Sequence, residues 1–141
     1  MDRAQLTEWL EGYERAWRTP GTDALAGLFA ERASYSTAPY ENLHRGLDAI
    51  ARMWEAERAG PDEEFSMSSE IVAVEGNTGV ARVEVHYRRP DEKEDRDDRQ
   101  RSEYLDLWIV RLDDAGLCVE FEEWPFWPPD QRGAPAAGAP G

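Results

Sequence analysis

The chain has 141 residues, and 16 Lys and Arg stand against 30 Asp and Glu, so its formal net charge is −14. This length favours a single domain, and the negative charge would repel phosphate backbones and anionic lipid, which argues against nucleic-acid and membrane partners. A content of 40% hydrophobic and 11% aromatic residues excludes a disordered chain.

The first predicted element is an amphipathic helix near the N-terminus. Asp2 and Gln5 have the spacing of a capping box, and Pro20-Gly21 would end the helix. Between these signals, apolar residues recur at steps of three and four. They are Leu6, Leu10, Tyr13 and Trp17.

Two further helices and one short strand are predicted before the chain changes character. Thr22 would cap a short second helix, and residues 33–37 have the composition of a strand. A third helix is predicted over residues 47–59, where apolar side chains share one face. The first half of the chain is therefore predicted to be mainly helical.

In the second half the hydrophobic period changes to two, which predicts a β-sheet. Turn residues at 75–77 and 113–116 would join neighbouring strands as tight antiparallel hairpins. Residues 88–101 hold six basic, six acidic and no apolar residues, which indicates either a solvated hairpin extension or a docking or lid loop. We expect one domain over 1–128 and a disordered Pro/Gly/Ala tail over 129–141. The predicted strands are 65–75, 79–88, 102–112 and 117–124.

Residues 13–50, with their LFAE-A segment and the later P…RG-DAI pattern, resemble the opening of the nuclear transport factor 2-like superfamily, which includes SnoaL-like and ketosteroid-isomerase-like domains. Residues 70–87 and 107–124 take the places of the central hairpins of that family. The resemblance implies an α+β fold, in which three N-terminal helices pack in the concave face of a curved, mixed but mainly antiparallel sheet that forms a cone-shaped barrel. It also implies a hydrophobic pocket and a homodimer. It names no reaction, because the superfamily includes isomerases, polyketide cyclases, dehydratases, epoxide hydrolases and non-catalytic binding modules.

The resemblance also implies candidate catalytic positions. Tyr13 falls where isomerase-like members place a tyrosine that holds an oxyanion, and the strand acid of those members falls at Trp108. Asp106 lies two residues earlier and shares a strand face with Trp108. The resemblance implies that this face points inward, where a buried Asp106 could act as an acid. The base position of the isomerases falls within 37–39, where no side chain accepts a proton near neutral pH.

The last predicted strand ends its apolar stripe in a carboxylate. Val119, Phe121 and Glu123 share one face, so Glu123 could be a functional acid inside the protein. The alternative is a salt bridge between Glu123 and Arg82 or Arg111.

The strand at 79–88 carries one apolar and one polar face. If Arg82, Glu84 and His86 point inward, His86 and Glu84 form a candidate general-base pair, and Arg82 could hold an anion. If they point outward, they form a charged surface, such as a dimer contact. His44 is expected at the surface.

Aromatic residues are more numerous than a small core requires, so they either line a site for a flat, apolar carbonyl compound or close the core by packing. The two histidines have no metal-binding spacing, the chain has no nucleotide-binding motif, and its lone Cys118 can form no internal disulfide. Because no apolar signal segment is present, we expect a cytoplasmic protein. The sequence predicts cofactor-independent acid–base chemistry on a small apolar molecule, or a non-catalytic module that binds a ligand or a protein. The candidate ligand contacts are Trp17, Tyr35, Tyr40, Trp54, Tyr104, Trp108 and Phe121, together with Arg82 and Glu84.

Overall fold

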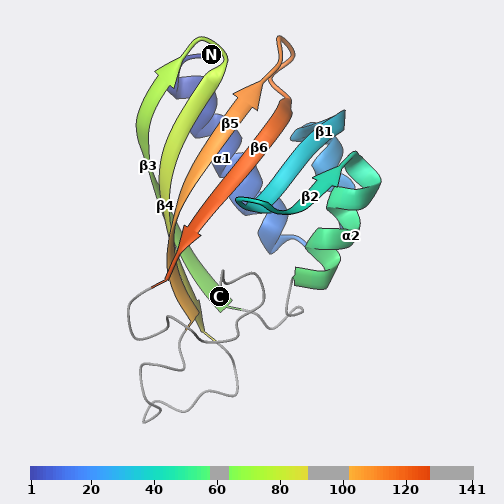
Figure 1. The fold of residues 1–141 in the computed structure, drawn as a ribbon, viewed down its shortest axis with the longest axis vertical. Helices are drawn as coiled ribbons and strands as arrows, with labels where there is room; N and C mark the ends of the chain where they lie inside the picture. The colour runs from blue at the N-terminus through green and yellow to red at the C-terminus, as the bar shows by residue number, and fades with distance from the viewer. Residues whose placement is uncertain (58–63, 89–101, 128–141) are drawn as a thin grey trace.

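The structure is a computed structural model that describes residues 1–57, 64–88 and 102–127. These residues form an α+β fold with one six-stranded mixed sheet in the order β2-β1-β6-β5-β4-β3 (Figure 1). The predicted α+β class is thus confirmed, with an open sheet in place of a closed barrel. The elements are α1 (Arg3–Arg18), the 3-10 helix η1 (Asp23–Gly27), β1 (Phe29–Ala38), β2 (Glu41–Arg45), α2 (Leu47–Glu57), β3 (Glu64–Glu75), β4 (Thr78–Arg88), β5 (Ser102–Leu112) and β6 (Cys118–Phe126).

Helix α1 begins at the predicted capping box. The Asp2 side chain accepts a hydrogen bond from the Gln5 backbone N–H at 2.8 Å, and the Gln5 side chain accepts one from the Asp2 N–H at the same distance. The helix crosses one face of the sheet, which we call the inner face (Figure 1). Its buried residues are Leu6, Trp9, Leu10, Tyr13 and Ala16.

The prediction of three helices is wrong in one element. Residues 23–27 form only a 3-10 helix of five residues, because Phe29 already enters β1 and pairs with Cys118 of β6. The Thr22 side chain makes no capping hydrogen bond. The sequence analysis also missed β2, which folds back on β1 after a turn in which Tyr40 adopts a φ of 68°.

The predicted hairpins β3–β4 and β5–β6 are both present and antiparallel. Gly76 and Gly116 provide the positive φ angles of 58° and 84° that their turns require. Strand β1 pairs with β6 in parallel, which makes the sheet mixed. The predicted charged loop after residue 88 and the predicted tail at 129–141 lie outside the described residues.

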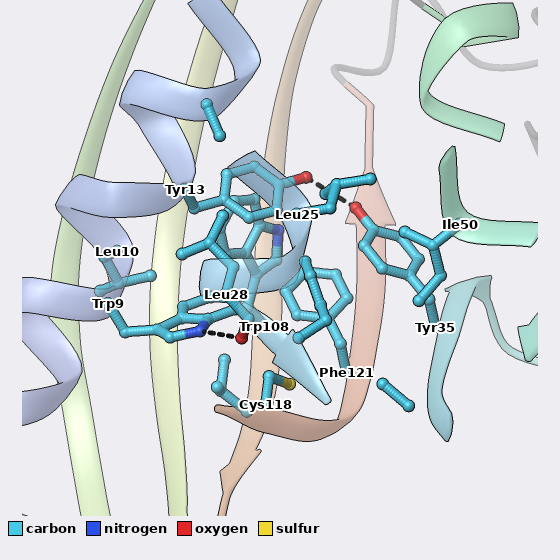
Figure 2. Packing of buried hydrophobic residues seen from close by; sticks show 14 of the residues in the cluster. Trp9, Leu10, Tyr13, Leu25, Leu28, Tyr35, Ile50, Trp108, Cys118 and Phe121 are labelled. Atoms are coloured by element: carbon cyan, nitrogen blue, oxygen red, sulfur yellow. Dashed lines mark hydrogen bonds between the residues drawn. The ribbon is translucent and has the colours of Figure 1, made fainter. Parts of the chain in front are cut away.

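The core between α1 and the inner face is built largely from aromatic rings (Figure 2). Tyr13 lies at the centre, with ring-centroid distances of 4.5 Å to Trp108, 5.0 Å to Trp54 and 5.8 Å to Phe121. Cys118 is buried in the same core as a free thiol. No described helix is long and apolar enough to span a membrane.

Candidate active site

Strand β5 turns a buried acid, Asp106, toward the core. Asp106, Trp108 and Val110 are 1%, 3% and 0% exposed, whereas Leu105 and Leu107 on the opposite face are exposed. The inward orientation that the sequence analysis assumed for this face is therefore the one in the structure. Asp106 thereby lies among apolar side chains, where an ionised carboxylate must be stabilised by specific partners.

Asp106 has two such partners. The Trp108 indole N–H donates a hydrogen bond of 2.9 Å to Asp106 Oδ2. The second partner comes from β6, where Glu123 lies opposite Trp108, so its carboxyl is a diagonal neighbour of Asp106 and within hydrogen-bonding reach of it. Two carboxyls can form a hydrogen bond only when one of them is protonated.

Glu123 has the more strongly raised pKa of the two carboxyls. Burial, the hydrogen bond with Asp106 and the negative charge of Asp106 raise the pKa of Glu123 well above its usual range, and the charge of Glu57 adds to the effect. Burial also raises the pKa of Asp106, but hydrogen bonds from Glu123 and Trp108 act in the opposite direction. The pKa values of both carboxyls are therefore raised, and the two groups titrate as a coupled pair.

A pair of tyrosines lies beside the carboxyls. The hydroxyl oxygens of Tyr13 on α1 and Tyr35 on β1 are 2.6 Å apart and share a hydrogen bond (Figure 2). Burial raises the pKa of Tyr35 well above 10, and the nearby charge of Glu123 raises it further. Tyr35 therefore stays neutral and can act only as a hydroxyl donor or acceptor.

The aromatic ligand candidates separate into three groups by exposure. Those in the first group are buried and pack in the core, which is the alternative to ligand contact that the sequence analysis left open. They are Tyr35, Trp54, Trp108 and Phe121. Trp17 and Tyr104 are half-buried at the edge of the core. Tyr40 is fully exposed in the β1–β2 turn.

The polar face of β4 points away from the core. His86 and Glu84 contact each other at 2.9 Å on the outer face of the sheet, and Arg82 pairs with Glu70 at 2.9 Å on the same face. The interior of β4 is formed by the other face, with Val83 and Val85 buried. The hypothesis that Arg82, Glu84 and His86 line the interior is thus corrected, because the strand packs its apolar side on α1.

The structure also places the remaining candidates. Arg111 pairs with Glu120 at 2.8 Å on the outer face, so neither Arg82 nor Arg111 reaches Glu123. His44 lies half-buried on β2. In the described part of the chain, no group of three or more His, Cys, Asp or Glu side chains could hold a metal ion.

The carboxyl pair lies toward one end of the fold. Glu123 and Tyr104 are half-buried there, and Met67 and Val85 lie in the same row across the sheet as Tyr104. Helix α2 ends nearby at Glu57, whose charge acts on Glu123. Sequence reasoning missed Glu57, because a glutamate at an exposed helix end has no distinguishing pattern.

The profile of the SnoaL-like domain matches residues 10–121. The chain therefore belongs to the SnoaL-like family of the nuclear transport factor 2-like superfamily, as the resemblance implied. No curated protein matches the sequence.

Several solved structures share the fold. A candidate polyketide cyclase from Sinorhizobium meliloti has 24% sequence identity and a TM-score of 0.60, with 82% of this chain and 93% of that chain covered. A candidate SnoaL-like isomerase from Agrobacterium tumefaciens has 19% sequence identity and a TM-score of 0.63, with 88% of this chain and 99% of that chain covered. An LEH-like epoxide hydrolase from Mycobacterium tuberculosis has 10% identity and a TM-score of 0.59, with coverages of 87% and 84%. At these identities the similarity establishes the fold and leaves the reaction open.

Proposed function

We propose that this protein catalyses proton transfer on a small, uncharged, apolar carbonyl compound without a cofactor, and that Glu123 is the residue that meets the substrate. The observation that carries the proposal is the buried Asp106–Glu123 carboxyl pair, whose pKa values are both raised; in the proposed mechanism this pair shares a single proton. Asp106 is 1% exposed and lies behind Glu123, so it acts as the positioning partner. A buried acid pair next to neutral hydroxyls is an arrangement suited to general acid–base catalysis.

The pair can serve as a base in one step. Glu123 passes its own proton to Asp106 and accepts a proton from the carbon next to the substrate carbonyl, which leaves two neutral carboxylic acids and an enolate. The negative charge thereby moves from the carboxyl pair to the enolate oxygen. Because burial disfavours a charge on the pair, the pair is a stronger base than a carboxylate in water.

The tyrosine pair can stabilise the product of this step. The Tyr35 hydroxyl shares a hydrogen bond with the Tyr13 hydroxyl, and the raised pKa of Tyr35 keeps its proton in place. A hydroxyl held in a fixed position can donate a hydrogen bond to the developing enolate oxygen without reorganisation. The proton then returns from Glu123 to carbon, and Asp106 returns its proton to Glu123.

Deuterium exchange tests this proposal directly. The probe is 2-tetralone, a flat neutral ketone with exchangeable protons next to its carbonyl, and NMR in D2O measures the exchange rate. We expect the wild-type protein to exceed the buffer rate, and Glu123→Gln to lower the protein-dependent rate by about 10²–10⁴-fold, because the amide cannot accept the proton. Asp106→Asn should lower it as well, since Glu123 then loses its proton acceptor.

Glu122→Gln is the matched control. Glu122 is the neighbouring residue on β6, faces the opposite side of the sheet, and undergoes the same change from carboxyl to amide. Its exchange rate should equal that of the wild type. Exchange at the buffer rate with wild-type protein, or full activity in Glu123→Gln, would contradict the proposed catalysis.

A second candidate function, a protein-binding module, is favoured by a different surface. We call it the outer apolar patch: four exposed side chains on the outer face of β5 and β6, in which Leu105 pairs with Phe126 and Leu107 with Trp124 across the strands. Leu105 is 48% exposed, Phe126 56%, Leu107 37% and Trp124 40%. Contiguous exposed apolar residues of this kind mark interaction sites.

We propose that a second copy of this chain covers the outer apolar patch. The patch is bordered by groups of both signs, namely the Arg82–Glu70 and Arg111–Glu120 pairs. Under a two-fold axis, arginines of one copy can face glutamates of the other, which makes the surface self-complementary despite the net charge of −14.

Sedimentation analysis tests the dimer. The wild type is expected to sediment as a dimer and Leu107→Glu as a monomer, because the substitution places like charges at the centre of the contact. Leu43→Glu, at an exposed leucine on β2 outside the patch, should remain dimeric. A monomeric wild type at about 100 µM, a concentration at which even a micromolar dimer would assemble, or a dimeric Leu107→Glu, excludes this interface.

A further inference from the structure

Among the residues that the structure describes, the charges that act on the carboxyl pair are negative. Every arginine whose side chain the structure describes is exposed. The strands nearest the pair direct Arg82 and Arg111 to the outer face, where glutamates hold them. Among the described residues, Asp106 and Glu57 act on Glu123 through their charges. Glu123 and Tyr104 act on Tyr35 in the same way.

The pair itself is not fully satisfied by hydrogen-bond donors. Asp106 is 1% exposed, and its Oδ2 accepts the hydrogen bond from Trp108. Its Oδ1 is buried and receives no N–H or hydroxyl donor from the described residues. A ligand with a hydrogen-bond donor or a positive charge would stabilise a negative charge on this oxygen.

Half-buried aromatic rings lie at the same end of the fold as Glu123. Tyr104 is half-buried there and lies 6.0 Å from Trp127, measured between ring centroids. Trp17 is half-buried at the end of α1 and packs on Trp54 at 4.8 Å. The faces of such rings attract cations and repel anions.

One described arginine, Arg18, lies at this end of the fold. Its guanidinium lies 4.0 Å from the centre of the Phe65 ring, donates to the Phe65 carbonyl at 3.1 Å, and pairs with Glu14 at 3.0 Å. These contacts use its charge to fix α1 on β3. An anionic ligand would have to displace Glu14 to gain this arginine as a partner.

We infer that the site selects its substrate by charge: it takes flat carbonyl compounds that are neutral or carry an amine, and it rejects carboxylates and phosphates. This inference rests on the proposed function, because it takes the Asp106–Glu123 pair as the place where the substrate binds. It goes further by naming the substrate class. An amine near the reacting carbonyl would donate to the pair, whereas a carboxylate would bring a third acid next to two that already disfavour each other's ionisation.

Calorimetric titration with three ligands of one shape tests the inference. The probes are 2-acetylnaphthalene, which is neutral, 2-(aminomethyl)naphthalene, which is a cation at pH 7, and 2-naphthoate, which is an anion. We expect the amine and the ketone to bind the wild type, and the naphthoate to bind at least about 10-fold more weakly than the amine, as Coulomb energies between partly buried charges imply.

The double variant Asp106→Asn/Glu123→Gln identifies the source of the discrimination. It removes the charge of the pair but keeps its shape, so the affinities for the amine and for the naphthoate should converge to within about threefold, since the Coulomb energy that separates them is gone. Glu122→Gln serves as the control and should keep the wild-type ratio.

The possible outcomes separate this inference from the proposed catalysis. Equal or tighter binding of the naphthoate by the wild type, or no binding of any probe, overturns the charge selectivity. A ratio unchanged in the double variant also overturns it, because the pair would not be its source. Selective binding without deuterium exchange of 2-tetralone would support the charge selectivity and contradict only the catalysis.

Discussion

Glu123→Gln should become progressively more stable than the wild type as the pH rises above about 4.3, the usual pKa of an unfolded glutamate. The reason is the raised pKa of Glu123 in the folded state, which burial and Asp106 cause. The glutamine cannot ionise, and its amide can still donate a hydrogen bond to Asp106. Denaturant unfolding of both proteins at pH 5, 6, 7 and 8 measures the difference in the free energy of unfolding.

The sign of this effect follows from proton linkage. Below the unfolded pKa, Glu123 is protonated in both states, and its contribution to stability is fully present. Between the unfolded and the folded pKa, the unfolded state releases the proton while the folded state keeps it, so the stability of the wild type falls as the pH rises. Above the folded pKa the loss is complete.

Glu122→Gln separates this local effect from the general repulsion in a chain with a net charge of −14. Both variants replace one carboxyl of β6 by an amide, but Glu122 faces away from Asp106. The stability difference between Glu122→Gln and the wild type should stay nearly constant with pH. If the two variants show the same pH dependence, the Asp106–Glu123 pair does not share a proton.

The sequence predicted each carboxyl of the pair but could not predict their contact. Alternation alone placed Glu123 at the end of an apolar stripe, and the family resemblance directed Asp106 inward. Their proximity depends on the register of β5 against β6, and a shift in this register between Arg111 and Leu112 interrupts the simple count from the turn. One residue of slippage would have placed the two acids on opposite faces.

The orientation of β4 shows a second limit of pattern reading. Arg82, Glu84 and His86 alternate as regularly as the valines between them, so the pattern is compatible with a charged site inside or a charged surface outside. The decision comes from α1, whose apolar residues cover the inner face and leave no water for buried charges. Likewise, β2 forms by pairing with the edge of β1. Such pairing depends on tertiary context and leaves no pattern in the local sequence.

Leu6→Ala is expected to reduce the free energy of unfolding by about 2–5 kcal/mol, because it leaves a cavity where α1 meets the sheet. Leu6 is 0% exposed. Leu43 on β2 is 57% exposed, so Leu43→Ala makes the same chemical change at the surface and should alter stability by less than about 0.5 kcal/mol. Denaturant unfolding of the two variants provides the comparison, and a similar loss in both would contradict the packing described for α1.

Gly79 explains why Leu6 can lie so close to β4, and it allows the same contact to be tested from the other side. A Cβ at position 79 would lie 2.5 Å from Leu6 Cδ2, so Gly79→Ala should cost about 1–3 kcal/mol by overpacking. In the Leu6→Ala background that methyl group is absent, and the added Cβ can occupy part of the cavity. The double variant should therefore be more stable than the sum of the two single losses predicts. Strict additivity would mean that α1 does not approach the sheet at Gly79, and the position of Tyr13 on the same helix would then need revision as well.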